Sequence, residues 1–200
     1  METTYKTLTR EQFLFHEMRT TARLMNLGKT DEEIISDIAE ENLFQYPTER
    51  MIKNLASVCI RRLHAMESDE LVELIADGSS SSAKQGCLYA MMQHNKLVRD
   101  FMITVIGEKY RLKDYSYSRR EMNVFFTRLQ EQDDAVASWS EETIAKSKSV
   151  ITRVLVENEY LDSSKSDSLN TVLIDYTLKN VLLDKRDYAS LRAFNCFEGD

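Results

Sequence analysis

The scarcity of residues that interrupt helices is the feature of this sequence that most restricts its fold. Its 200 residues include one proline and five glycines. In a helix interior, proline costs about 3 kcal/mol and glycine about 1 kcal/mol relative to alanine, and tight β-turns depend on these same residues. Because 42% of the residues are hydrophobic, the chain can also bury a core. The composition therefore predicts a compact, multi-helix protein of mainly α structure.

The spacing of the apolar residues predicts a succession of amphipathic helices. Apolar side chains recur every three or four residues along most of the chain, which places them on one side of each helix. We expect Gly28 to end the first helix, Thr30 to Glu33 to start the second through a capping box, and Pro47 to open the third. The helices are expected at residues 9–26, 30–42, 47–66, 69–76, 83–94, 96–110, 118–130, 140–160, 175–184 and 187–194.

These helices are expected to form three units. An N-terminal unit resembling a helix-turn-helix covers residues 1–66, central helices cover 67–110, and a C-terminal unit resembling a winged helix-turn-helix covers 111–200. A serine-rich loop is predicted at residues 79–82. Periodicity does not decide between strand and helix at residues 169–176, so a short C-terminal β wing is an alternative there.

The cysteines and the apolar segments indicate a protein of the cytoplasm. Cys59, Cys87 and Cys196 are odd in number and far apart, which favours free buried thiols over a disulfide framework or a zinc site. The longest apolar run, Phe101 to Ile106, is far shorter than the roughly 20 residues of a membrane-spanning helix. The N-terminal residues lack a secretory signal pattern. We therefore expect a cytoplasmic protein without a membrane span.

No arrangement of residues indicates catalysis. The sequence has no glycine-rich phosphate loop, no Gly-x-Ser-x-Gly and no His-Glu-x-x-His. The three histidines lack partners at metal-ligand spacing, and the two pairs of adjacent acids suit the first turns of helices. We therefore expect no catalytic residue, no metal site and no cofactor.

The net charge of −7 excludes a uniformly basic surface, but the positive charges are grouped. Residues 49–62, 109–120 and 143–156 have charge balances of +3, +4 and +3. Each group could be an ordinary solvated helix face. Two of them lie on helices that follow a shorter helix and a turn, where a recognition helix would face the major groove. The predicted contacts to duplex DNA are Arg50, Lys53, Arg61, Arg62, Arg119, Arg120, Lys146, Lys148 and Arg153.

Several stretches of the sequence resemble one protein family. They lie at residues 31–34, 41–45, 50–52, 62–63, 88–90, 100–101, 109–110, 125–126, 136–146 and 155–161, and they include Glu-Asn-Leu-Phe-Gln and Val-Ala-Ser-Trp-Ser. Together these stretches resemble BrxA, a small component of the bacterial BREX, or bacteriophage exclusion, defence systems. The resemblance extends over most of residues 9–165. Many relatives have glycine where this chain has Glu159. The sequence therefore does not fix the C-terminal end of the helix predicted at residues 140–160.

The resemblance implies an all-helical, NusB-like protein that binds DNA, is not an enzyme, and acts beside other BREX proteins. We accordingly expect a DNA-binding accessory component. Six to ten phosphate contacts would make its affinity for duplex fall by about 10³–10⁵ between about 50 and 200 mM salt. One alternative is a protein–protein scaffold whose methionine and aromatic residues at 88–105 include an exposed groove. NusB-like RNA binding is another.

Overall fold

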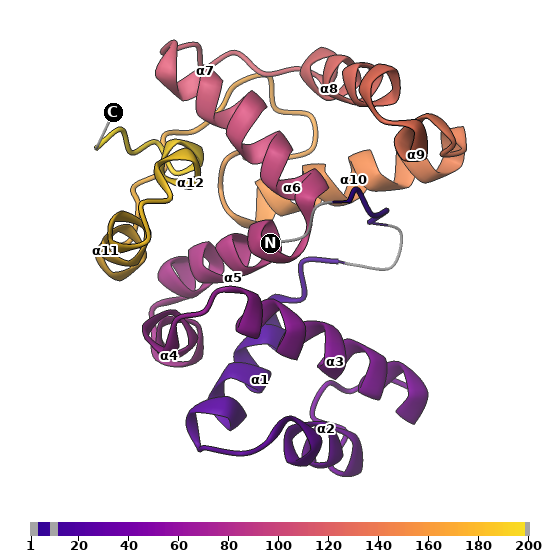
Figure 1. The fold of residues 1–200 in the computed structure, drawn as a ribbon, viewed down its shortest axis with the longest axis vertical. Helices are drawn as coiled ribbons and strands as arrows, with labels where there is room; N and C mark the ends of the chain where they lie inside the picture. The colour runs from indigo at the N-terminus through magenta and orange to yellow at the C-terminus, as the bar shows by residue number, and fades with distance from the viewer. Residues whose placement is uncertain (1–3, 9–11, 199–200) are drawn as a thin grey trace.

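Helices and their connections account for the described part of the chain, residues 4–8 and 12–198, in this computed structural model (Figure 1). No strand occurs among these residues. The mainly α-helical fold predicted from composition is therefore confirmed. The helices are α1 (Phe15–Asn26), α2 (Asp31–Glu40), α3 (Glu49–Ala65), α4 (Asp69–Asp77), α5 (Ser80–His94), α6 (Lys96–Phe101), the π-helical η1 (Met102–Gly107), α7 (Glu108–Arg111), α8 (Arg119–Gln132), α9 (Asp134–Ala137), α10 (Glu141–Glu157), α11 (Tyr176–Asp184) and α12 (Tyr188–Ala193).

The junction between α1 and α2 has the predicted local structure. Gly28 adopts a left-handed conformation, with a φ of 75°, just after α1. Thr30 and Glu33 form the predicted capping box. The Glu33 amide donates to the Thr30 hydroxyl at 3.3 Å, and the Thr30 amide donates to the Glu33 carboxylate at 2.8 Å. These bonds satisfy amides that the first turn of a helix leaves without a partner.

Side-chain caps explain two helix starts that differ from the prediction. The hydroxyl of Thr48 accepts a first-turn amide of α3, so Pro47 lies before the cap and not inside the helix. The hydroxyl of Ser79 accepts a first-turn amide of α5 at 3.1 Å. The serine-rich residues 79–82, predicted as a loop, therefore start a helix.

The first helix is shorter than predicted. Residues 9–11 of its predicted span lie outside the described residues, and residues 12–14 are not helical. Leu14 has a φ of 59° and turns the chain into α1. Both Phe13 and Leu14 are nevertheless buried. The apolar spacing that predicts a helix here thus belongs to an irregular segment packed into the core.

The helix predicted at residues 96–110 contains a wider turn. α6, η1 and α7 follow one another directly, and the middle one has π-helical geometry. α12 packs against η1 at Gly107, where an added Cβ would lie 3.2 Å from the Cβ of Arg192. The glycine therefore permits the close approach of these two helices.

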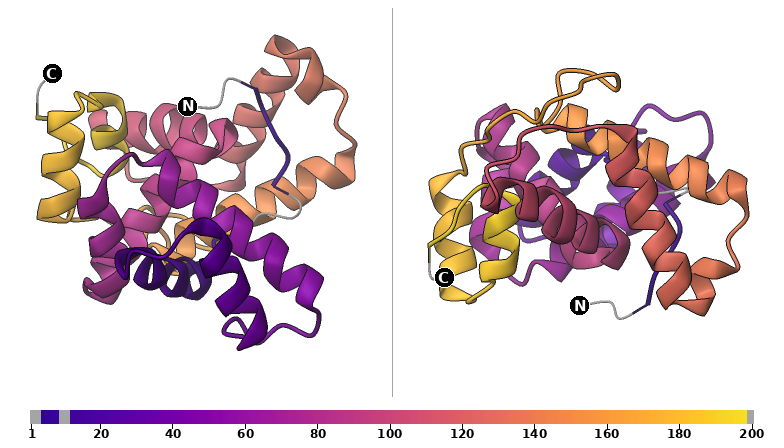
Figure 2. Two further views of the ribbon diagram at one scale, coloured as in Figure 1. Left: turned by 60° about the horizontal axis from the view of Figure 1, so that its bottom comes forward. Right: turned by 90° about the horizontal axis from the view of Figure 1, so that it is seen from above.

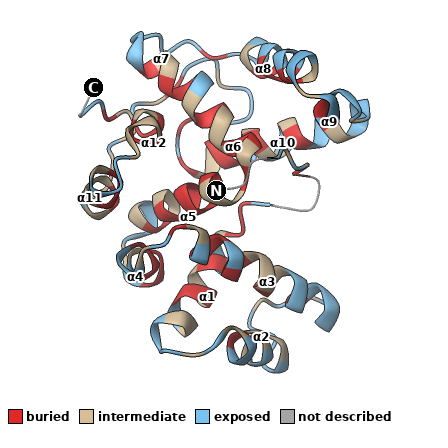
Figure 3. Ribbon diagram, in the orientation of Figure 1, coloured by how far each residue is buried: buried red, intermediate tan, exposed pale blue. Residues whose placement is uncertain are grey.

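Two hydrophobic clusters hold the helices together. The larger one includes buried residues from Leu8 to Cys196 and draws on all three predicted units, whose division stays a prediction. The smaller one lies between α2 and α3 and consists of Ile34, Ile38, Ile52, Ala56 and Ile60. Figure 3 shows the exposed outer faces of α2 and α3 around this small cluster. α2 and α3 thus have a core of their own at one end of the molecule (Figure 1).

The methionine-rich segment belongs to the larger core. Met91, Met92, Phe101 and Met102 are fully buried. These side chains fill the space around which α5 and α6 pack with their neighbours. The exposed groove that the scaffold alternative places at residues 88–105 is therefore wrong for these residues.

The C-terminal segment before α11 forms neither strand nor helix. Residues 169–175 are irregular, so the predicted wing is not found there. The hydroxyl of Tyr110 donates to one carbonyl of this segment at 2.6 Å, and the side-chain amide of Gln85 donates to another at 2.9 Å. Side chains thus provide hydrogen bonds that a neighbouring strand would otherwise supply. The segment leads to α11 and α12, which lie across the body from α8 and α9 (Figure 2).

The cysteines are expected to be unreactive in the folded protein. All three are free and buried, as their spacing predicts. Burial raises the pKa of Cys59 to about 12 and raises the pKa of Cys87 as well, so neither thiol forms the reactive thiolate near neutral pH. We expect DTNB at pH 8 to label the native protein very slowly and to label all three cysteines after unfolding in guanidinium chloride. Rapid labelling of the native protein would contradict this burial.

Candidate nucleic-acid interface

The outer face of α3 presents a row of polar side chains. Arg50, Asn54 and Arg61 are exposed and spaced by four and seven residues, so they lie within about 40° of one line along the helix. Lys53 lies beside them and forms an ion pair with Glu49 at 2.5 Å. The opposite face of α3 packs into the small hydrophobic cluster. The outer face of α3 therefore combines three cations with one anion, and its charge is net positive.

α2 limits the directions from which a polyanion can approach α3. Its ten residues include five carboxylates. One of them, Asp31, lies 2.9 Å from the ring of His64 on α3. Because carboxylates repel phosphates, a nucleic acid would have to approach α3 from the side that faces away from α2. The row of Arg50, Asn54 and Arg61 lies on that side, since the small cluster lies between the two helices.

Arg62, one of the predicted contacts, is a structural residue. Its exposed fraction is 0%. Its guanidinium donates to the backbone carbonyls of Gln12 at 2.9 Å and Phe13 at 3.2 Å. The side chain therefore holds the segment before α1 against α3 and does not reach solvent. This burial argues against the predicted DNA contact of Arg62, because its charge serves hydrogen bonds inside the protein.

Lys148 is likewise directed toward another helix. Its ammonium group donates to the side-chain oxygen of Asn123 at 2.8 Å and lies 5.4 Å from the centre of the Phe126 ring. Both partners belong to α8, against which this side of α10 packs. Lys148 therefore faces away from the other two basic residues predicted on α10.

Lys146 and Arg153 share an exposed face of α10 with two acids. Glu142 and Glu157 lie four residues before the lysine and four after the arginine, and so fall on the same side of the helix. Lys146 binds Glu142 at 2.8 Å, and this hydrogen bond lowers the pKa of the carboxyl group. Arg153 donates to the side-chain oxygen of Gln12 at 3.2 Å. Two cations and two anions leave this face without net positive charge.

The group at residues 109–120 retains only part of its predicted charge at the surface. Lys109 is largely buried and binds Asp114 at 2.8 Å and Glu121 at 3.5 Å. Its hydrogen bond is the main cause that lowers the pKa of Asp114 to about 2. Arg119 and Arg120 begin α8, are exposed, and form no ion pair within the described residues. These two arginines remain available to a ligand.

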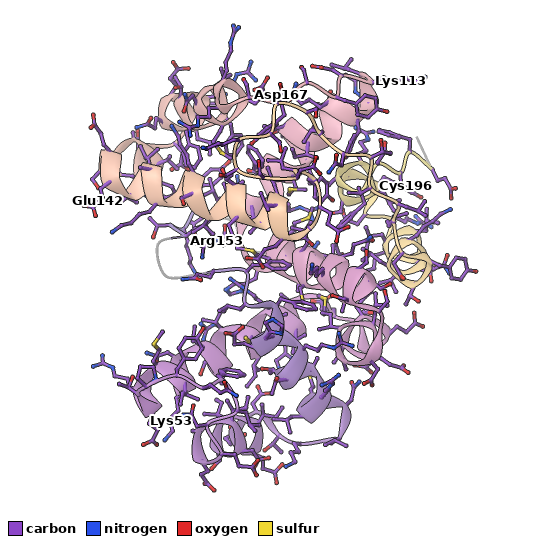
Figure 4. All side chains as sticks on the ribbon, turned by 180° about the vertical axis from the view of Figure 1, so that it is seen from behind. Lys53, Lys113, Glu142, Arg153, Asp167 and Cys196 are labelled. Carbon is purple, nitrogen blue, oxygen red and sulfur yellow. The ribbon has the colours of Figure 1, made fainter. Side chains whose placement is uncertain are left out.

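The three basic groups do not converge. Figure 4 places Lys53 toward one end of the long axis, Lys113 toward the other, and Arg153 between them. Of the nine predicted residues, only Arg50, Lys53 and Arg61 lie together on an exposed helix face with net positive charge. The sequence prediction omitted Asn54, whose position four residues after Arg50 could have identified it as a member of that row.

The described residues offer neither a metal site nor a membrane-spanning helix. Within residues 4–8 and 12–198, no three His, Cys, Asp or Glu side chains are grouped so that they could hold a metal ion. Over the same residues, no helix combines the length and the apolar character needed to cross a bilayer.

Comparison with known proteins identifies the family. The BrxA family model matches residues 4–186. A BREX protein BrxA from Bacillus cereus is 34% identical over 167 residues, which cover 83% of this chain and 83% of the relative. A BREX protein BrxA from Paramagnetospirillum magneticum is 26% identical over 176 residues, 88% of each chain. The crystal structure of an uncharacterized protein from Magnetospirillum magneticum matches with a TM-score of 0.80 and 25% identity, over 95% of this chain and 97% of that one. The chain therefore belongs to the BrxA family of BREX defence-system proteins.

Proposed function

We propose that this BREX component is a non-enzymatic accessory protein that binds duplex DNA through the outer face of α3. The observation that supports this proposal is the exposed row of Arg50, Asn54 and Arg61 on the face of α3 opposite its small hydrophobic cluster, with Lys53 at the edge of that face. Arg119 and Arg120 lie on a different helix and would contact a duplex only at its flank. Cytoplasmic location and likeness to NusB stay predictions.

The side chains on this face suit the major groove. α3 has 17 residues and is therefore about 25 Å long, enough to lie along the groove. Arginine and lysine bind phosphates, arginine also reads guanine, and asparagine reads adenine through paired hydrogen bonds. Residues 41–48 connect α2 to α3, which exceeds the three or four residues of a helix-turn-helix turn. α3 is accordingly proposed as a DNA-binding helix because of its exposed face and not because of that motif.

The salt dependence of duplex binding tests the proposal. Three cations on α3 predict a slope of log affinity against log salt of about −2.7, which is about a 40-fold loss between about 50 and 200 mM. This loss is smaller than six to ten contacts would give, because only Arg50, Lys53 and Arg61 of the nine predicted residues lie on the proposed DNA-binding face. An Arg50→Ala/Arg61→Ala variant should bind more weakly and reduce the slope to about −0.9.

Arg153→Ala provides the matched control, since it removes an exposed arginine outside α3. Its slope should stay close to that of the wild type. Undetectable or salt-independent binding, or an equal loss in the control, would refute the proposal. Structured RNA that competes better than duplex would favour the NusB-like alternative, and cleavage of the duplex with Mg²⁺ present would refute the non-enzymatic role.

A further inference from the structure

An apolar groove lies between η1–α7 and α8, at the end of the molecule opposite to α2 and α3 (Figure 1). Its volume is about 520 Å³. Val105, Phe125 and Leu129 form its apolar floor, and two hydrophobic side chains reach solvent beside them. Leu112 is 64% exposed and Val124 is 39% exposed. An exposed apolar surface of this kind is typical of a site that another molecule covers.

The carboxylates of this groove already have partners. Asp100 accepts from Lys96 and from the hydroxyl of Tyr5, each at 2.6 Å. Glu108 accepts from Arg111 at 2.7 Å. Glu121 accepts from the Ser118 amide at 2.8 Å in the capping box of α8. These acids are therefore satisfied within the protein.

The arginines of the groove are not neutralised in the same way. Arg120 and Arg128 line it, are exposed, and have no ion pair within the part of the chain that the structure describes. Arg120, Val124 and Arg128 follow one another at intervals of four residues, so they form one edge of the groove with an apolar side chain between two cations. At 1.5 Å per residue the two arginines are about 12 Å apart along α8, which is close to two turns of a helix.

We propose that this groove binds an acidic amphipathic helix of a partner protein. The apolar side of that helix would cover Leu112 and Val124, and two carboxylates seven or eight residues apart would bind Arg120 and Arg128. Helices commonly dock into grooves in this way, and arginine binds carboxylates through paired hydrogen bonds. A nucleic acid would meet the arginines but would leave the apolar floor uncovered.

A second copy of this chain is a poorer occupant. Its most acidic helix, α2, has five carboxylates, but its isoleucines Ile34 and Ile38 are fully buried against α3. The carboxylates of α2 could therefore bind the arginines, but α2 has no exposed apolar side that could cover the groove. The required partner therefore combines exposed carboxylates with exposed apolar residues on one helix.

A synthetic helix tests the chemistry of the groove. The probe is a fluorescent 18-residue peptide with leucines along one side and glutamates seven residues apart beside them; its control has lysine in place of each glutamate. We expect saturable binding of the glutamate peptide only. Arg120→Glu/Arg128→Glu should weaken it by about tenfold or more, because like charges would then face each other. An Arg119→Glu/Arg153→Glu variant should bind the glutamate peptide with nearly unchanged affinity.

Crosslinking in cells that contain the whole BREX system tests the natural partner. A photo-reactive benzoylphenylalanine at Leu112 should crosslink to an acidic, amphipathic segment of one other component, and the reversal at Arg120 and Arg128 should abolish the product. Leu27, which is 73% exposed and outside the groove, provides the control position. The proposal would be overturned if position 112 formed no more crosslinks than position 27. It would also be overturned if position 112 crosslinked only to nucleic acid, to a second copy of this chain or to a non-acidic segment.

The two proposals fail separately. An Arg50→Ala/Arg61→Ala variant should bind the glutamate peptide normally, because α3 takes no part in the groove. A Val124→Ser variant should lose peptide binding and retain the salt slope of duplex binding. Loss of duplex binding in the Val124→Ser variant would make the groove part of a nucleic-acid surface and would contradict its assignment to a protein partner.

Discussion

An Arg62→Met variant is expected to lose about 3 kcal/mol of the free energy of unfolding, whereas Arg61→Met should change it by less than about 0.5 kcal/mol. The two arginines are adjacent on α3, but Arg62 is fully buried and Arg61 is exposed. The buried guanidinium donates to the carbonyls of Gln12 and Phe13. Methionine fills a similar volume and donates nothing, so both carbonyls would lose hydrogen bonds to a charged group, each of which contributes about 1.5–3 kcal/mol.

Urea denaturation followed by circular dichroism measures this difference. Duplex binding of the folded variants provides a second readout with the opposite pattern. Arg61→Met should bind duplex more weakly, because one phosphate contact is lost, while Arg62→Met should bind as the wild type does at low urea. If the two variants were equally stable, Arg62 would not anchor the segment before α1. If only Arg62→Met lost duplex binding, Arg62 and not Arg61 would belong to the DNA interface.

The helices were predictable wherever the signal lay within the helix itself. Thr30, Ser118 and Ser140 each precede a helix start that the structure confirms, because a cap acts on amides only two or three residues away. The prediction failed where distant segments decide the conformation. Phe13 and Leu14 are buried without being helical, and residues 170–174 are held by side chains from α5 and α7. No local pattern distinguishes such segments from helix or strand.

The basic groups were less predictable, because the charge of a segment does not say where each side chain points. Helical spacing contained part of the answer. Arg62 lies three residues after the buried Cys59 and four before the buried Met66, and Lys148 lies three before the buried Ile151. These positions belong to the inner sides of α3 and α10. Spacing could not reveal which distant groups accept the hydrogen bonds of these two side chains. Arg62 donates to the segment before α1, and Lys148 donates to α8.

The second large effect is expected at the ion pair that joins α6 to α12. Arg99 binds Asp187 at 2.9 Å, and the two side chains are only 13% and 14% exposed. The hydroxyl of Ser190 donates to the same carboxylate at 2.8 Å, and the side-chain amide of Gln93 donates at 3.1 Å. Asp187→Asn keeps the shape and the cap of α12 but leaves a buried guanidinium without its counter-charge. Breaking a buried pair in this way costs about 3–5 kcal/mol.

The pH dependence of this loss identifies its cause. Burial alone would raise the pKa of Asp187, but the hydrogen bonds and charge of Arg99, together with Ser190, lower it below its usual value in the folded protein. A lowered pKa contributes stability above the pKa of the unfolded chain, and this contribution disappears as the pH falls through the folded pKa. The stability gap between wild type and Asp187→Asn, measured by urea denaturation, should therefore be full near pH 7 and narrow below about pH 4. Asp184→Asn, at an exposed position in the last turn of α11, should change stability by less than about 0.5 kcal/mol. A gap that stays constant down to low pH would mean that shape, and not charge, accounts for the effect of Asp187.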